Sequence, residues 1–333
     1  MIHQYIERES GQIVTEKLYA DRMINFLYNH ARENAGTLFK ALTSSISSRL
    51  LGFFNYDLPC VLNMCNSKHV IQDLNIDLDE CMESIEHLNS PRKIFERKIN
   101  YWEKRPMPDD PAAVVSPADS KMLVGSFENE SQLFLKKKFF QFEELIGPEK
   151  TEWLRAFSKG DYAVFRLTPE KYHYNHAPVS GEVLDIYEYD GRYHSCNPGA
   201  LIAEATPYSK NKRVVTIIDT RVPNGSGVGL VAMIEIVALM IGNIIQCYSD
   251  TRYQRPRKVT RGLFLKKGQP KSLYRPGSSL DVLIFQKDAV TFCEDIISNM
   301  HHSNVTTRFS KAFGRPVVET DVTVRSHIAT GLS

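Results

Sequence analysis

Apolar side chains recur at helical spacing through the first hundred residues. From Leu38 to Leu50 a leucine or isoleucine returns every four positions, and Glu16–His30 has a similar pattern. Ser90–Trp102 opens with a serine cap before a proline, as helices often do. We therefore predict a helical N-terminal region, residues 1–110, that packs on the rest of the chain. In an alternative interpretation the aromatic-rich Leu50–Phe54 contacts a membrane surface.

Beyond Pro106–Pro111 the pattern changes to short β-branched and apolar runs, separated by turn signals such as Asp190-Gly191 and Pro223-Asn224-Gly225. Pro148–Phe157 and Asp288–Asn299 interrupt these runs, and we expect helices there. The pattern predicts an α+β fold, in which a β-rich, mostly antiparallel domain of residues 111–333 follows the helical region. The expected strands are Ala113–Val115, Tyr162–Leu167, Gly181–Tyr189, Arg213–Asp219, Val228–Ala238 and Leu280–Phe285.

One apolar stretch, Gly227–Tyr248, approaches the length of a membrane span. Glu235 and Asn243 interrupt it, and a charge near the centre of a lone span is costly. Its β-branched residues and glycines favour two buried strands that meet near Leu239–Gly242. We predict core sheet here and no transmembrane helix.

Composition narrows the class of protein without identifying it. The 333 residues are 42% hydrophobic and 24% charged, which is typical of a globular protein and excludes a disordered or collagen-like chain. Six scattered cysteines form no CxxC pair, which argues against a zinc ribbon, a redox motif or a disulfide scaffold. The polar start MIHQYIERES lacks the layout of a signal peptide, so we expect a reducing, cytoplasmic setting.

Three short motifs carry side chains that could do chemistry, although each has an ordinary structural explanation. His173 and His176 lie in YHYNH, and such a pair is more often structural than catalytic. HxxH without a nearby carboxylate is weak evidence for a metal, and we predict none. Asp119 follows an apolar run, where it could orient a histidine or cap its own turn. Gly277–Ser278 precedes a buried strand and does not match the GxSxG elbow of hydrolases.

Taken together and in order, these motifs resemble the signature of the phosphatidylserine decarboxylases. That family's blocks run approximately SPADG, DYHRxHxP and FxxGS(T/S), and this chain has SPADSKM, YHYNHAPVSGEV and LYRPGSSLDVLIF. Phe95–Pro106 is similar to the family's FFTRxLKPGARP stretch. Val228–Ile244 is similar to its valine- and glycine-rich strand pair, and Val317–Ile328 to its closing segment. The resemblance therefore covers most of the chain.

The resemblance implies a zymogen that cuts itself between Gly277 and Ser278. The Oγ of Ser278 would attack the carbonyl of Gly277, while His176 takes the proton and Asp119 orients His176. The ester so formed is lost by β-elimination, and the dehydroalanine left at 278 hydrolyses to a pyruvoyl group with release of ammonia. A glycine at 277 permits the close approach and unusual backbone conformation that this step needs.

The mature enzyme implied by the resemblance is a lyase of phospholipid biosynthesis. It would consist of a 1–277 beta chain and a 278–333 alpha chain, whose pyruvoyl group, derived from Ser278, is the only cofactor. This group would form a Schiff base with phosphatidylserine and act as an electron sink while CO2 leaves. His173 is the candidate that protonates the product, phosphatidylethanolamine.

The match has departures, which leave the substrate open. Ser120, Lys171, Tyr174, Tyr274 and Pro276 stand where the family usually has other residues, but none of the candidate residues above is lost. One alternative is a pyruvoyl-dependent decarboxylase of a free aromatic amino acid such as tryptophan. Two others are a non-cleaving β-rich binding protein and a Ser-His-Asp hydrolase that keeps its serine uncut.

A basic stretch precedes the glycine–serine motif. No acidic residue lies between Asp250 and Asp281, and we predict that the stretch attracts an anionic phospholipid surface at the inner face of the membrane. The simpler alternative is a solvated loop. No recognition motif accompanies the charges, so we expect no nucleic acid as a partner; a homo-oligomer stays open. The basic residues are Arg252, Arg255, Arg257, Lys258, Arg261, Lys266, Lys267, Lys271 and Arg275.

Overall fold

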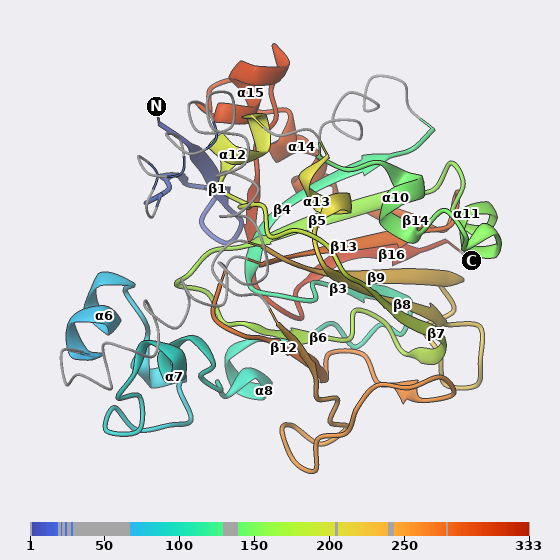
Figure 1. Cartoon of the computed structure of the whole chain (residues 1–333), viewed down its shortest axis with the longest axis horizontal. Helices are drawn as coiled ribbons and strands as arrows, with labels where there is room; N and C mark the ends of the chain where they lie inside the picture. The colour runs from blue at the N-terminus through green and yellow to red at the C-terminus, as the bar shows by residue number, and fades with distance from the viewer. Residues whose placement is uncertain are drawn as a thin grey trace.

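A ten-stranded sheet runs through the centre of the computed structural model (Figure 1). The structure describes residues 2–18, 21, 24, 28, 67–128, 139–203, 206–238, 243–277 and 279–332. Neighbouring strands of this sheet are antiparallel except β1 and β15, which are parallel. In spatial order they are β11 (Phe264–Leu265), β7 (Gly181–Tyr189), β8 (Arg213–Asp219), β9 (Leu230–Val237), β13 (Ser279–Phe285), β5 (Asp161–Leu167), β4 (Ser120–Ser126), β15 (Thr320–Val322), β1 (Gln4–Glu7) and β2 (Ile13–Thr15).

Two small antiparallel sheets and a set of short helices complete the described fold. One small sheet contains β10 (Ile244–Gln246), β12 (Pro270–Tyr274) and β6 (Tyr174–His176); the other contains β14 (Val290–Phe292), β16 (His327–Gly331) and β3 (Ala113–Val115). The helices are α6 (Ser67–Asp73), a 3-10 turn (Leu78–Glu80), α7 (Pro91–Phe95), α8 (Tyr101–Lys104), α10 (Phe142–Ile146), α11 (Thr151–Ala156), α12 (Pro198–Ala203), α13 (Pro207–Lys210), α14 (Glu294–Met300) and α15 (Arg308–Phe313). In Figure 1, α10 and α13 lie above the central strands, β6 and β12 below them, and α6 to α8 at one end.

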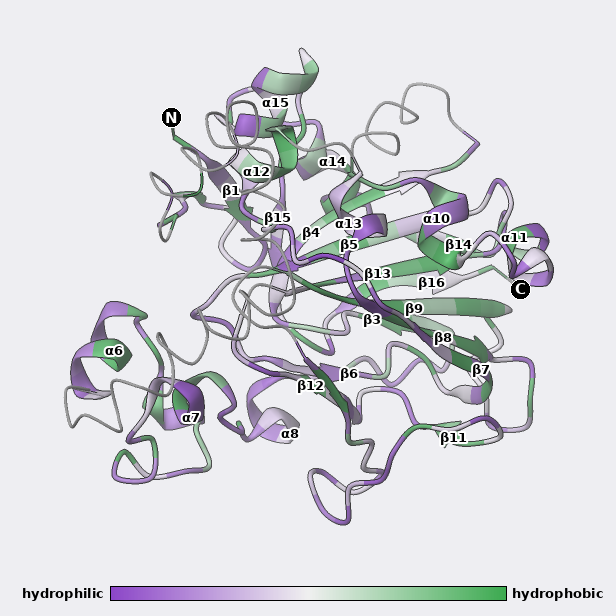
Figure 2. Ribbon diagram, viewed as in Figure 1, coloured by the Kyte–Doolittle hydropathy of each residue, from purple (hydrophilic) through white to green (hydrophobic). Residues whose placement is uncertain are grey.

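Strand β13 lies in the middle of the core. All seven of its residues are buried, and it pairs with β9 along one edge and β5 along the other. Its apolar side chains belong to the same hydrophobic cluster as those of α10, α11 and α14. Figure 2 shows hydrophobic colouring concentrated on these central strands, whereas the outer loops are mostly hydrophilic. Helices α10, α11 and α14 therefore pack on the core that surrounds β13.

The strand predictions are confirmed with one exception. Ala113–Val115, Gly181–Tyr189 and Arg213–Asp219 match β3, β7 and β8 residue for residue. The apolar stretch 227–248 contains two strands, as its glycines and β-branched residues indicated, but only β9 is a buried strand of the main sheet. Strand β10 is partly buried and belongs to a small separate sheet, so the prediction of a second buried strand is wrong. In the part of the chain that the structure describes, no helix has the length and apolar character needed to cross a membrane.

The helical interpretation of the N-terminal region is wrong at its start. Gln4–Glu7 and Ile13–Thr15 are β1 and β2, at the edge of the main sheet. Ile6 is buried against Val305 and Val318, and such a short strand leaves no periodicity that the sequence could reveal. The helices expected over Glu16–His30 and 37–54 fall almost wholly outside the described residues.

Two other helix predictions need correction at their ends. The Ser90 side chain accepts a hydrogen bond from the backbone N–H of Lys93, which confirms the cap, but helix α7 ends at Phe95 instead of continuing to Trp102. Residues 288–299 were expected to be helical, yet they begin with strand β14, and helix α14 starts only at Glu294. In each case a short element is fixed by its tertiary packing rather than by a repeating pattern.

Candidate active site

The three sequence blocks meet in space at the head of β13. Phe95, Ala118, Leu167 and Tyr274 form one buried apolar cluster, although they come from four separate segments. The ring of His173 stacks on Phe95, with 3.6 Å between the ring centroids. The backbone N–H of Tyr274 donates to the carbonyl of His173 at 3.1 Å, which ties β12 to the histidine segment.

The Gly277–Ser278 junction lies between β12 and β13. Gly277 is buried and has a φ of +147°, a conformation that side-chain-bearing residues rarely adopt. Ser279 begins β13, where it pairs with Leu167 of β5 and Val237 of β9. Ser278, the predicted nucleophile, lies outside the described residues. The expected cut therefore falls where the chain enters the most buried strand of the sheet.

His173 is a buried histidine without a hydrogen-bond partner among the described residues. Its side chain is 0% exposed, and neither Nδ1 nor Nε2 makes a hydrogen bond of ordinary geometry, although the backbone of Lys171 lies close enough to favour a protonated ring. Burial, reinforced by the nearby positive charge of Arg97, lowers the pKa of His173 to about 3, so the ring is neutral at physiological pH. Buried polar atoms are normally satisfied, which makes an unsatisfied imidazole a candidate functional group.

His176 is also fully buried, but both of its ring nitrogens are bonded. Nδ1 lies 2.9 Å from the carbonyl oxygen of Gly268, and Nε2 lies 2.9 Å from the hydroxyl of Tyr172. The backbone N–H of His176 donates to the carbonyl of Pro117 at 2.8 Å, so β6 lies against the loop that carries Asp119. Burial lowers the pKa of His176 to about 3.

Asp119 does not make the expected hydrogen bond to His176. Arg105 donates to both of its carboxylate oxygens, at 3.1 and 2.8 Å, and the backbone N–H of Val324 donates at 2.7 Å. Burial alone would raise the pKa of Asp119, but the Arg105 guanidinium holds it below its usual value. Arg105, which also pairs with Glu80 at 2.8 Å, therefore occupies the position in which we expected the histidine.

Tyr274, one of the departures from the family pattern, links three strands through its hydroxyl. The hydroxyl lies 2.7 Å from the carbonyl of Leu280 and 2.8 Å from the carboxyl group of Asp281, and it accepts from the N–H of Ile236 at 3.1 Å. Burial and the nearby charge of Glu235 raise the pKa of Asp281 well above its ordinary value. The extra oxygen of Tyr274 thus connects β12 to β13 and β9.

Glu235, the charge that interrupts the apolar stretch, is fully buried and paired. The Nζ of Lys271 lies 2.7 Å from its carboxylate, and both side chains are 0% exposed. Asn175, Ser272 and Gln246 also donate to Glu235. Because a buried ion pair is tolerated only when its remaining groups are satisfied, this network explains how a charge sits inside a core strand.

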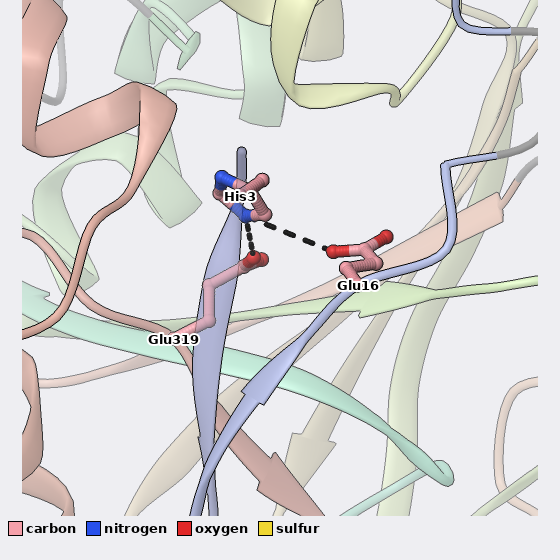
Figure 3. Close-up of side chains that lie close together, drawn as sticks. All are labelled: His3, Glu16 and Glu319. Atoms are coloured by element: carbon pink, nitrogen blue, oxygen red, sulfur yellow. Dashed lines mark hydrogen bonds and ion pairs between the residues drawn. The ribbon is translucent and has the colours of Figure 1, made fainter. Parts of the chain in front are cut away.

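The only group of possible metal ligands among the described residues lies at the N-terminal strands (Figure 3). It consists of His3, Glu16 and Glu319, with His3 Nε2 2.9 Å from Glu319. One nitrogen of Arg166 lies 2.6 Å from each carboxylate, so a guanidinium already supplies the positive charge that a metal would bring. The cluster holds the β1–β2 hairpin against the main sheet.

The basic stretch divides into exposed and buried residues. Lys267 and Lys271 are buried, and the Nζ of Lys267 donates to three backbone carbonyls, so neither can reach a surface. Arg275 is partly buried beside Glu96. The exposed basic residues are Arg252, Arg255, Arg257, Lys258, Arg261 and Lys266. We refer to these six as the basic loop.

Comparison with known proteins shows which class of protein carries this site. A family model described as phosphatidylserine decarboxylase matches residues 92–314. The chain is 29% identical over 305 residues to a protein of Fusobacterium nucleatum, covering 89% of this chain and 91% of that one. It is 29% identical over 295 residues to one of Ruminiclostridium cellulolyticum, and 26% identical over 295 residues to one of Chlamydia trachomatis serovar D. These matches cover 88% of this chain and 91% and 90% of the relatives.

All three relatives are named phosphatidylserine decarboxylase proenzyme. The matched region contains the buried junction and both histidines, and it defines the protein as a decarboxylase, that is, a carboxy-lyase. The chain belongs to the phosphatidylserine decarboxylase family.

Proposed function

We propose that the protein decarboxylates phosphatidylserine to phosphatidylethanolamine and CO2, and that its catalytic group is a pyruvoyl made from Ser278 by self-cleavage after Gly277. The observation that carries the proposal is the conformation of Gly277. This residue is buried, has a φ of +147° and lies just before the central strand β13. The relatives' printed name, proenzyme, supports processing of this kind. When formed, the pyruvoyl group would withdraw electrons from the substrate as CO2 leaves.

The topology supports an enzyme whose two chains stay associated after self-cleavage. The 278–333 chain would contain β13, which is paired along both edges with strands of the 1–277 chain. It would also contain β15 and β16, which pair with β4 and β3. Because all seven residues of β13 are buried, the two chains would remain a tightly packed heterodimer without the peptide bond.

We assign the proton transfers to the two buried histidines. His176 would take the proton of the Ser278 hydroxyl during cleavage, and His173 would protonate the product of decarboxylation. Burial is the main effect that opposes protonation of both rings, whereas the negative charge of Asp119 favours it, and at His176 the charges of Arg325 and Arg105 partly cancel that of Asp119. Asp119 would therefore act on the rings only through this partly cancelled charge. His173 is neutral before substrate binds; an anionic substrate nearby would raise its pKa and let it carry the proton.

The substrate is tested by presenting purified protein with phosphatidylserine in detergent micelles and, separately, with free tryptophan. We expect phosphatidylethanolamine, seen by thin-layer chromatography, with an equal amount of CO2. A cleaved protein that converts only tryptophan would favour the free-amino-acid alternative. A protein that neither cleaves nor releases CO2 would favour the binding-protein alternative, and hydrolysis of an ester substrate by the uncut chain would favour the hydrolase.

We also propose that the basic loop attaches the protein to an anionic phospholipid surface at the inner face of the membrane. Each exposed basic residue contributes at most about 1 kcal/mol near such a surface, and Arg257 and Arg261 contribute less because Asp250 and Asp185 already pair with them. We expect binding to phosphatidylcholine vesicles that contain phosphatidylglycerol, measured by sedimentation, with loss of binding at high salt. Reversing two charges, Lys258→Glu with Lys266→Glu, should weaken binding about tenfold or more.

The matched control reverses two exposed lysines elsewhere, Lys68→Glu with Lys311→Glu, and changes the net charge equally. It should bind almost as the unmodified protein does. Equal losses in the two double variants would mean that net charge, rather than the basic loop, governs binding. Binding to neutral vesicles that does not depend on salt would contradict the proposal that the basic loop attaches the protein to an anionic surface.

A further inference from the structure

His176 belongs to a series of hydrogen bonds that runs through Tyr172 and Tyr253 to the backbone of Ile99. Its Nδ1 faces the carbonyl of Gly268 at 2.9 Å, and its Nε2 faces the hydroxyl of Tyr172 at 2.9 Å. The hydroxyls of Tyr172 and Tyr253 are 2.7 Å apart. The hydroxyl of Tyr253 contacts both backbone groups of Ile99, the N–H at 3.2 Å and the carbonyl oxygen at 3.0 Å.

The direction of these bonds follows from the carbonyl of Gly268, which can only accept. Nδ1 of the neutral His176 therefore carries the hydrogen, and Nε2 has a lone pair. Tyr172 must then donate to Nε2, and Tyr253 must donate to Tyr172. The oxygen of Tyr253 accepts from the N–H of Ile99. Every group in the series has a partner in this direction.

The same series of hydrogen bonds can also form with every donor and acceptor reversed. If Nε2 of His176 gains a proton, it donates to the oxygen of Tyr172. The Tyr172 hydroxyl turns toward Tyr253, and the Tyr253 hydroxyl turns toward the carbonyl of Ile99. The proton added at Nε2 is the one that leaves the Ser278 hydroxyl in the proposed cleavage, and neither tyrosine loses its own proton. The reversal needs only two hydroxyl rotations, because Ile99 offers both a donor and an acceptor.

We propose that Tyr172 and Tyr253 are positioning residues of His176, forming a reversible relay that satisfies the buried imidazole in both protonation states. A buried histidine without such a relay would leave a charged N–H unbonded, at a substantial cost. The relay lets His176 accept a proton in an interior that otherwise opposes it. This inference rests on the proposed role of His176 in self-cleavage.

The decisive variant is Tyr253→Phe, which removes the end of the relay and keeps the ring. Without the Tyr253 oxygen, the reversed Tyr172 hydroxyl has no acceptor, so proton uptake by His176 becomes harder. We expect self-cleavage after cell-free synthesis to slow about tenfold, a fraction of what acid–base catalysis contributes. The matched control is Tyr174→Phe, whose ring packs 5.1 Å from Tyr253 and whose hydroxyl is not in the relay. It should cleave at the unmodified rate.

A second variant separates proton relay from packing. Incorporation of 3-fluorotyrosine at position 253 preserves shape but makes the hydroxyl a stronger donor and a weaker acceptor. It should slow cleavage to a rate between those of the unmodified protein and Tyr253→Phe. An unmodified rate with fluorotyrosine, or equal rates for Tyr253→Phe and Tyr174→Phe, would overturn the relay.

A third measurement does not depend on cleavage. In the Ser278→Ala chain, 15N NMR of labelled histidine, assigned with His176→Gln, should show the hydrogen of His176 on Nδ1 at neutral pH. A hydrogen on Nε2 would overturn the relay even if processing occurs. An unmodified chain that never cuts would instead overturn the proposed function, and the tautomer would still test the relay.

Discussion

The Ser278→Ala variant is expected to remain a single chain and to release no CO2 from phosphatidylserine. Alanine has no hydroxyl to attack the Gly277 carbonyl, and it cannot become a pyruvoyl group. Both processing and decarboxylation should therefore fall below detection, whereas the unmodified protein shows both. Gel electrophoresis after long incubation, combined with a CO2 release assay, measures the two effects on the same sample.

The adjacent serine is the matched control for this experiment. Ser279→Ala changes a side chain at the start of β13 but leaves its backbone pairing with β5 and β9 in place. We expect this variant to cleave. Cleavage in Ser278→Ala, or its loss only in Ser279→Ala, would show that the wrong serine has been assigned.

The His173→Leu variant is expected to fold, to cleave itself, and to lose decarboxylation by about 10²- to 10⁴-fold. Leucine has a similar volume and is apolar, and the ring nitrogens that it replaces have no partner among the described residues. Stability should therefore be unchanged or higher by about 1 kcal/mol. Urea unfolding in the Ser278→Ala background measures stability on an uncut chain, and single-turnover CO2 release measures activity.

This combination separates a functional histidine from a structural one. A structural role would lower stability and leave the activity of the folded fraction intact. Failure to cleave would show that His173 also takes part in processing and that our division of work between His173 and His176 is wrong. Full decarboxylation by a cleaved, folded variant would remove His173 from the reaction.

The sequence was sufficient to predict an element wherever a local pattern of residues determines the structure. Val228–Ala238 and Leu280–Phe285 could be predicted as strands because continuous apolar runs with β-branched residues need burial on both faces. The three sequence blocks also indicated a common site before any geometry was known. The structure brings Ala118, His173 and Tyr274 to the same buried region.

Side-chain partners that are distant along the chain could not be predicted in this way. Arg105 was part of the family-like stretch, but nothing in its neighbourhood indicated that it would take both oxygens of Asp119. Tyr253 lies in a basic segment whose composition suggested only a surface, and its contact with Tyr172 depends on the tertiary fold. Lys271 belongs to the same basic segment, for which we predicted a surface, although it is buried against Glu235.

The intact mass of the purified protein under denaturing conditions tests the central claim most directly. Self-cleavage predicts a 277-residue chain and a second chain of the remaining 56 residues (333 minus 277). The smaller chain should be lighter than its serine form by the mass of one ammonia, as a pyruvoyl terminus requires. A single uncut chain of 333 residues, unchanged after long incubation, would contradict the account.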